Sequence, residues 1–149
     1  MWSGLYPEKN KINQTYADEM SEIIKTLEDF GIYVILDMHQ DMMSSKFDAY
    51  DGVPIWILNE FPEPRRPFPW PFSNKTTNLV FAAYVTEACG FAFQCLYNNV
   101  SGSESYFHQF WSKVAQIYSN YSSVLGVISS FKLFFWSNIS GNKGKKNFH

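Results

Sequence analysis

The sequence predicts an α/β fold in which helices cover parallel strands, and two segments carry that prediction. Residues 15–30 have the spacing of an amphipathic helix and lead through Gly31 into the apolar run Ile32–Leu36. Residues 103–119 also have helical spacing and lead into Val124–Ile128. Both runs are continuously apolar, which is typical of strands buried on both faces in parallel sheets. We therefore expect neighbouring parallel strands at about 32–38 and 124–128.

The helix over 15–30 has signals at both ends. Thr15 is the predicted N-cap, with Asp18 three residues on, and acidic side chains gather in the first half, where the helix dipole favours negative charge. Gly31 predicts the stop, because glycine tolerates the left-handed backbone that commonly ends a helix. The expected apolar face consists of Tyr16, Met20, Ile23, Ile24, Leu27 and Phe30.

Residues 40–78 predict a long but ordered loop. Five prolines occur within the ten residues 62–71, and aromatic residues are interspersed with them. Proline restricts the backbone while the rings supply surface for packing, so the segment does not have the composition of a flexible linker. Loops of this length in a compact domain usually form a lid or the wall of a binding site. We expect this one to lie over the carboxyl ends of the strands.

The remaining helical signals are less regular. Residues 79–97 are predicted to be helical in part, although Gly90 weakens the pattern. Cys89 and Cys95 would lie on different faces of a continuous helix, so a disulfide would need a break near Gly90, and two buried thiols are the alternative. The spacing Ser101-x-x-Glu104 predicts a capping box for the last helix. The expected apolar face of that helix consists of Phe107, Phe110, Trp111, Val114, Ala115 and Tyr118.

The composition excludes several classes of protein. The 149 residues are 46% hydrophobic, 19% aromatic and 17% charged, which suits one buried core and argues against a disordered tail or a disulfide-stapled scaffold. A net charge of −2 provides no basic field for nucleic acid. No apolar run approaches the roughly 20 residues of a transmembrane helix. Neither cysteine has a second Cys or a His at ligand spacing, so we expect no metal and no cofactor.

Glycosylation triplets indicate the compartment. The pattern Asn-x-Ser/Thr occurs five times, against roughly 1.5 expected by chance. The chain begins without the basic and apolar segments of a secretory signal. We therefore expect a secreted, lysosomal or other endomembrane protein whose natural start lies upstream of Met1, with glycans at Asn13 and Asn74 in particular. The five candidate acceptors are Asn13, Asn74, Asn99, Asn120 and Asn138.

The predicted binding site follows the first strand, at Asp37-Met38-His39-Gln40-Asp41. In parallel α/β folds, ligands bind at the carboxyl ends of the strands. Asp37, His39 and Asp41 occupy alternate positions and would point the same way along an extended segment. Carboxylate and imidazole groups can hydrogen-bond sugar hydroxyls. The alternative is a polar cluster that only caps the strand.

The same residues begin a segment that resembles a known family. The run from Asp37 to Phe47 (DMHQDMMSSKF), followed by YDGVPIW at 50–56, closely resembles animal endoglycoceramidases, which are retaining enzymes of glycoside hydrolase family 5 on a (β/α)8 barrel. The similarity continues through PFPWPF at 67–72, ACG at 88–90 and YFHQFW at 106–111. It begins at Met1–Gly4, which looks like the end of barrel strand two, and extends to Gly126.

The resemblance implies a fold and a domain boundary. A complete barrel needs roughly 250 residues. The chain therefore resembles a partial (β/α)8 TIM barrel, about strands two to four with their helices, incomplete at both ends. On this interpretation residues 1–126 are a partial glycoside hydrolase barrel domain, and residues 127–149 are a divergent tail.

The resemblance also implies substrate-binding residues. His39 matches a strand-three histidine beside the sugar site, Asp37 matches a position that can contact the sugar, and Asp41 looks like a neighbouring support. Trp70 resembles a loop tryptophan that stacks on carbohydrate, with anchoring of the loop as the alternative. The implied substrate is a glycosphingolipid, cut between its oligosaccharide and its ceramide.

The catalytic carboxylates of the family have no counterpart in this sequence. Retaining hydrolysis needs two carboxyl groups about 5–5.5 Å apart. The family carries its acid/base glutamate in an Asn-Glu-Pro motif at the end of strand four. This chain has Val127–Lys132 at that place, and no Asp or Glu follows Glu104. The nucleophile belongs to strand seven. We expect an inactive glycosidase fragment. The alternatives are a non-catalytic glycan- or partner-binding remnant and another family 5 glucosidase, which the MMSSKF block disfavours.

Overall fold

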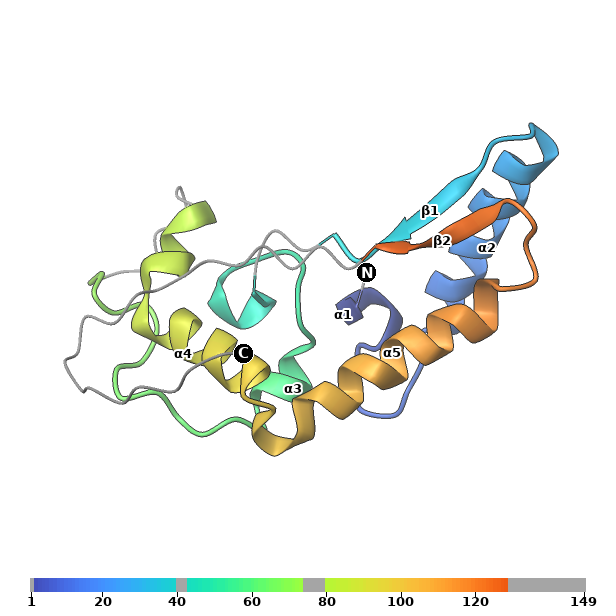
Figure 1. Ribbon diagram of the computed structural model, residues 1–149. Helices are drawn as coiled ribbons and strands as arrows, with labels where there is room; N and C mark the ends of the chain where they lie inside the picture. Colours follow the sequence, from blue (N-terminus) through green and yellow to red (C-terminus); the bar gives the residue numbers. More distant parts are fainter. Residues whose placement is uncertain (1, 40–42, 74–79, 129–149) are drawn as a thin grey trace, which may run out of the picture.

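The computed structural model describes residues 2–39, 43–73 and 80–128. Figure 1 shows the strands and α2 at one end of the molecule, α3 and α4 at the other, and α5 spanning both. In chain order the elements are α1 (Trp2–Leu5), α2 (Gln14–Asp29), β1 (Val34–Asp37), η1 (Ser45–Phe47), α3 (Ile55–Leu58), η2 (Val80–Val85), α4 (Glu87–Tyr97), η3 (Val100–Gly102), α5 (Ser103–Tyr118) and β2 (Val124–Ile128).

The two strands form a parallel pair, as the sequence predicts. Val34 lies opposite Val124 and Asp37 lies opposite Ile128, with one irregularity of register after Val34. β1 is shorter than the predicted 32–38, whereas β2 has the predicted bounds. Parallel neighbours need a long crossover connection. Here that connection runs from η1 to α5, so it carries the whole proline-rich loop.

The strands are not buried on both faces, which corrects the prediction from their continuous apolar runs. Ile35, Leu125 and Val127 are 54%, 64% and 52% exposed, whereas Leu36 is 4% exposed. Leu36 belongs to the same buried cluster as residues of α2 and α5. Within the described ranges, Leu36 therefore reaches the common core, and the other three side chains lie at the surface. An apolar run in the sequence shows which side chains can be buried. Whether they are buried depends on the elements that pack against the strand.

Helix α2 begins and ends close to its predicted limits, but its N-cap is not Thr15. The Asn13 side chain accepts a hydrogen bond from the backbone N–H of Tyr16, at 3.1 Å. Asn13 has extended backbone angles, whereas Thr15 already lies inside the helix, where its hydroxyl cannot cap the first turn. The predicted stop at Gly31 is confirmed by a φ of +69°. Ile23 and Phe30 of the expected apolar face are exposed.

The corner between α4 and α5 also differs from its sequence prediction. No capping box forms, because the Ser101 hydroxyl donates to the backbone carbonyl of Glu60, at 2.6 Å. The backbone N–H of Glu104 is instead capped by Asn99 Oδ1, at 2.9 Å. In this corner Ser101 and Asn99 both have positive φ angles, so the chain turns sharply before α5.

Helix α4 is continuous through Gly90, so the two cysteines do not approach each other. Cys89 and Cys95 are both buried free thiols, which confirms the second alternative. Burial raises the pKa of the Cys89 thiol to about 12, so it stays protonated and inert at neutral pH. The side chain of Thr86 caps the helix by accepting from the backbone N–H of Cys89, at 3.3 Å.

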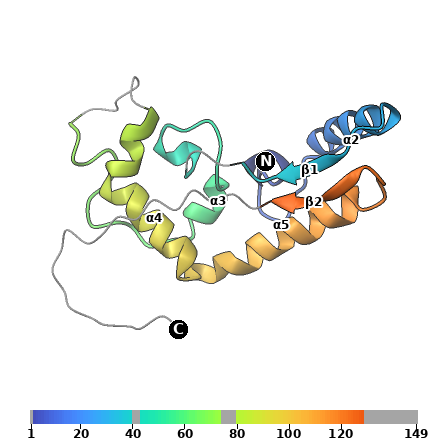
Figure 2. The same cartoon turned by 45° about the horizontal axis from the view of Figure 1, so that its top comes forward.

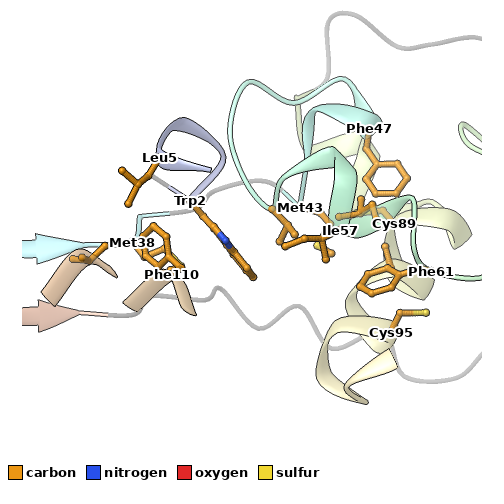
Figure 3. Close-up of a cluster of buried hydrophobic side chains, with 14 of the residues drawn as sticks. Trp2, Leu5, Met38, Met43, Phe47, Ile57, Phe61, Cys89, Cys95 and Phe110 are labelled. Carbon is orange, nitrogen blue, oxygen red and sulfur yellow. The ribbon is translucent and has the colours of Figure 1, made fainter. Parts of the chain in front are cut away.

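The first residues are helical, which corrects the interpretation of Met1–Gly4 as the end of a strand. In the turn Trp2–Leu5, the side chains of Trp2 and Leu5 lie three residues apart on one helical face, and both are 1% exposed. Figure 3 shows Trp2 between Met38 and Phe110 on one side and Met43 and Ile57 on the other. Burying this large ring joins the two ends of the molecule in one core.

The loop after β1 lies where the sequence predicts, though it is not structureless. Figures 1 and 2 place the segment from Met43 to Ser73 beyond the arrowheads of β1 and β2, beside α4. Within it, η1 and α3 bury Phe47, Ile57 and Leu58. The connection is therefore a packed subdomain next to the carboxyl ends of the strands.

Candidate functional site

The structure brings two of the predicted site residues together at the carboxyl end of β1. His39 Nδ1 lies 3.1 Å from Asp37 Oδ2. The carboxylate accepts from the ring nitrogen, which fixes the orientation of the imidazole. Asp37 lies opposite the last residue of β2, so the pair stands at the edge where both strands end. This is the position at which parallel α/β folds bind ligands.

The second carboxylate oxygen of Asp37 is a notable feature of this cluster. Asp37 Oδ1 is buried and has no hydrogen-bond partner among the described residues. An unpaired buried acceptor is costly. This oxygen is the observation from which a binding role for the pair is proposed below. Asp41, the third predicted member, lies outside the described residues.

Trp70 is presented at the surface of the proline-rich loop. Its side chain is 42% exposed, and the guanidinium carbon of Arg66 lies 5.1 Å from the centroid of its ring. Phe68 anchors the loop by packing on Phe47, with ring centroids 5.5 Å apart. The backbone N–H of Arg66 also donates to Glu87, at 3.1 Å. This placement is compatible with both roles expected for Trp70, contact with a sugar and anchoring of the loop.

The contacts of the predicted site residues form two pairs. Asp37 contacts His39 at the strand end, and Trp70 contacts Arg66 on the loop, where it is exposed. The sequence analysis did not include Arg66 among the candidate site residues. Its position four residues before Trp70 was the signal that could have indicated a contact between the cation and the ring.

The loop and α4 enclose a pocket that the sequence did not indicate. It has a volume of about 270 Å³ and is lined mainly by apolar side chains, including Phe61, Phe68 and Phe91, with Lys46 and Glu63 also in its wall. Pockets with this lining take the apolar part of a ligand.

A second unpredicted feature is a polar link centred on Glu60. Its carboxylate pairs with Lys9 and accepts a hydrogen bond from the hydroxyl of Tyr106, at 2.9 Å. Lys9 also lies over the Tyr106 ring, 5.2 Å from the centroid. The hydrogen bond from Lys9, followed by that from Tyr106, holds the pKa of Glu60 below its ordinary value of 4.5. The link connects three segments: the loop before α2, the end of α3 and the start of α5. Its role is to hold these segments in position.

The described residues lack a metal-binding cluster and a membrane-spanning helix. They contain no group of three or more His, Cys, Asp or Glu side chains that could hold a metal ion. None of the helices in the described part of the chain has the length and apolar character needed to cross a membrane.

Comparison with known proteins shows the family to which this fold belongs. Residues 1–127 match the family model for cellulases of glycosyl hydrolase family 5, so the chain belongs to glycoside hydrolase family 5. Within that family it is endoglycoceramidase-like. It is 38% identical over 139 residues to the endoglycoceramidase of Hydra vulgaris and 35% identical to that of Cyanea nozakii. Both matches cover 85% of this chain and 27% of the relative, so the chain spans about a quarter of their length.

Solved structures agree with the fold. Endo-glycoceramidase II from Rhodococcus sp., in a complex with a cellobiose-like imidazole, superposes with a TM-score of 0.66 at 21% sequence identity, over 85% of this chain and 28% of that one. The lactosyl-enzyme intermediate of the same protein gives a TM-score of 0.65. The family and these neighbours imply a (β/α)8 barrel, of which this chain contains a part with two adjacent parallel strands.

Proposed function

We propose that this chain is part of a retaining glycosidase that hydrolyses the O-glycosidic bond between oligosaccharide and ceramide in glycosphingolipids. The observation that carries the proposal is the Asp37–His39 pair, with its unpartnered buried oxygen, at the strand ends of a family 5 chain. The 38% identity to the Hydra vulgaris enzyme supports the substrate class. In the complete protein, Asp37 and His39 bind hydroxyls of the sugar beside the scissile bond. The two catalytic glutamates come from chain beyond this sequence.

The extent of the barrel domain is part of the proposal. Residues 1–126 form barrel strands and helices, and residues 127–149 form a divergent tail. The family match over residues 1–127 supports the first range. The lack of acidic residues after Glu104 supports the second, because the family needs a glutamate at the end of this strand.

The test uses a chimera, defined as the Hydra vulgaris endoglycoceramidase with its matching segment replaced by residues 1–126 of this chain. We expect the chimera to release oligosaccharide from a labelled ganglioside. Asp37→Asn or His39→Gln should lower kcat/KM by about 10- to 100-fold, since a hydrogen bond to a charged group contributes about 1.5–3 kcal/mol. Asp29→Asn, an exposed carboxylate at the end of α2, is the matched control and should leave kcat/KM unchanged.

Two results would contradict the proposal. One is a folded chimera that cleaves an aryl glucoside but no glycosphingolipid, which would indicate another family 5 glucosidase. The other is full activity in both the Asp37→Asn and the His39→Gln variants, because the strand-end pair would then have no part in binding the substrate.

A second function, glycan binding without catalysis, is favoured by one observation. Trp70 is exposed and Arg66 lies beside its ring, so the loop offers an aromatic surface and a cation without any catalytic carboxylate. A sugar ring packs its apolar face on such an indole. This candidate predicts that the 149-residue chain binds immobilised oligosaccharides and that Trp70→Ala abolishes binding. A chain that binds none of them would exclude it.

The compartment also belongs to the proposal. The chain enters the secretory pathway and acts outside the cell or in a lysosomal or endomembrane compartment. The five glycosylation triplets support this route. Secretion of the natural full-length protein, followed by a loss of mass on treatment with an N-glycan amidase, is the direct test, and Asn13 and Asn74 are the acceptors expected to account for it.

A further inference from the structure

Four of the five glycosylation triplets share a feature outside the triplet itself. An aromatic residue stands two positions before the asparagine at Phe72–Asn74, Tyr97–Asn99, Tyr118–Asn120 and Trp136–Asn138. Such a ring could hold the first sugar of a glycan, because the apolar face of a sugar packs on aromatic surface. The structure describes both residues of the Tyr97 and Tyr118 pairs, so it can tell which ring is placed to do so.

Asn99 presents its amide at a sharp corner between α4 and α5. Its φ of 55° lies in the left-handed region, which asparagine tolerates better than most residues. The side chain is exposed, and its Oδ1 accepts the hydrogen bond from the backbone N–H of Glu104. This hydrogen bond uses the carbonyl oxygen of the side-chain amide, whereas an N-linked sugar is attached to its nitrogen, Nδ2. Asn99 can therefore cap the helix and carry a glycan at the same time.

Tyr97 and Asn99 line the same cavity. It has a volume of about 370 Å³, and Leu96 and Phe107 also form its wall. That volume falls within the range of about 300–1,000 Å³ for small-ligand sites. The Tyr97 ring is 51% exposed and stacks on Phe93, with centroids 6.4 Å apart and planes 16° apart. The ring is therefore held in place with half of its surface open beside the acceptor asparagine.

The Tyr118–Asn120 pair has the same spacing but not the same geometry. Tyr118 is 1% exposed, and its hydroxyl donates to the backbone carbonyl of Ala17 inside the core. Asn120 itself is exposed. A sugar on Asn120 would thus have no access to the ring two residues before it. Asn120 is therefore an internal control for Asn99, because its neighbouring ring is not accessible to a sugar.

We propose that Asn99 carries an N-linked glycan whose first N-acetylhexosamine packs on Tyr97 in this cavity, whereas a glycan on Asn120 stands in solvent. In the modification, Asn99 Nδ2 forms a bond to the anomeric carbon of a lipid diphosphate-linked oligosaccharide. The bond from that carbon to the diphosphate oxygen breaks, the amide nitrogen gives up one proton, and the lipid diphosphate leaves. The proposal rests on the secretory route proposed above and is independent of glycosidase activity.

The experiment compares the two sites within one molecule. The chimera contains both Asn99 and Asn120 in a completed barrel; it is expressed with a cleavable secretory leader in eukaryotic cells, and site-resolved mass spectrometry measures occupancy at the two sites. The native protein is then treated with an N-glycan amidase. We expect both sites to be occupied and removal from Asn99 to be roughly threefold to tenfold slower, which corresponds to the contribution of about 0.5–1.5 kcal/mol for an aromatic contact.

Two changes should abolish the difference in rate. Denaturation removes the cavity, and Tyr97→Ala removes the half-exposed ring at the end of α4. Tyr33→Ala, which removes a tyrosine that is 69% exposed and directly precedes β1, is the matched control and should keep the difference.

Three results would overturn the proposal. The first is an Asn99 without glycan in chains that carry a glycan at Asn120. The second is equal rates of glycan removal from the two sites in the native protein. The third is a difference between these rates that persists in Tyr97→Ala. Absence of sugar at both sites would overturn this inference. Secretion of the natural protein tests the proposed route separately, and an inactive chimera would bear only on the glycosidase proposal.

Discussion

Asn13 is both the N-cap of α2 and the acceptor of a glycosylation triplet, so two properties of the protein depend on one side chain. The cap is a direct hydrogen bond to the backbone N–H of Tyr16. Thr15 completes the triplet but makes no contribution to the cap. Substitutions at the two positions can therefore separate stability from modification.

We predict that Asn13→Ala lowers the free energy of unfolding of the chimera by about 1 kcal/mol, because an orphan N–H at the helix start loses its acceptor. Asn13→Asp keeps a side-chain acceptor at the cap and should be nearly neutral. Thr15→Ala should also be nearly neutral, although all three variants destroy the triplet. Urea unfolding of unglycosylated protein measures these differences. A larger loss in Thr15→Ala than in Asn13→Ala would restore Thr15 as the cap.

Glu60 is the second single residue with a clear energetic role. Its carboxylate joins Lys9 and Tyr106, which belong to segments far apart in the chain. These hydrogen bonds favour the ionised form, so the pKa of Glu60 lies below its ordinary value of 4.5 in the folded protein. A lowered pKa contributes stability above the unfolded value, and that contribution disappears as the pH falls through the folded value.

We therefore predict that Glu60→Gln destabilises the chimera near neutral pH and that this difference shrinks below about pH 4.5, as the native carboxyl takes up its proton. Because the side chain is partly exposed, the loss at neutral pH should stay at about 1 kcal/mol. Urea midpoints at about pH 7 and about pH 3 compare the two proteins. A difference that grew on acidification would mean that Glu60 is not held in its ionised form.

At the scale of the elements, the two-stranded sheet is the least completed part of the structure. Helices α2 and α5 supply the neighbours of Leu36, whereas Ile35, Leu125 and Val127 remain exposed on the described part of the chain. Contiguous exposed apolar side chains and unpaired strand edges promote association between molecules. The sheet is therefore the expected origin of aggregation.

This leads to a prediction for the 149-residue chain. Ile35→Thr combined with Leu125→Thr should reduce both light scattering and binding of an apolar dye, because the side chains are half or more exposed and their loss removes little packing. In the chimera, Leu36→Ala should instead lower the free energy of unfolding by about 2–5 kcal/mol, since it removes a buried side chain. Increased dye binding in the double threonine variant would show that these residues are covered in solution.

At the scale of the whole molecule, the chain holds one core but about a quarter of the length of its relatives. We predict that residues 1–149 alone behave as an aggregating or molten-globule state, with bound apolar dye and no sharp thermal transition. Calorimetry and size-exclusion chromatography check this. A monomer with a single cooperative transition would contradict it.

We also predict no measurable hydrolysis of a ganglioside by residues 1–149. General acid–base catalysis alone typically contributes about 10²–10⁴-fold, and no Asp or Glu follows Glu104 to supply either member of the pair. Release of free oligosaccharide from a labelled substrate, with the chimera as the positive control, measures this. Turnover by the short chain that Asp37→Asn abolishes would place a catalytic carboxylate at the first strand.

Local patterns in the sequence determined the elements and the polar half of the site. The helical spacing, Gly31 and the apolar runs predicted α2, α5 and two parallel strands, because each of these signals acts between residues close in the chain. The alternation of Asp37 and His39 likewise predicted their pairing at the end of β1. The block from Asp37 to Phe47 indicated the family, which the match over residues 1–127 confirms.

Only the tertiary structure decided the features that depend on residues far apart in sequence. Whether Leu36 or Ile35 is buried depends on which helices pack nearby, and no periodicity within the strand contains that information. The link from Lys9 through Glu60 to Tyr106 joins positions whose separation hides them from any local pattern. The same reason leaves Tyr97 half-exposed beside Asn99 while Tyr118 is buried. Spacing sets which side chains are near in the chain, and packing sets which of them reach solvent.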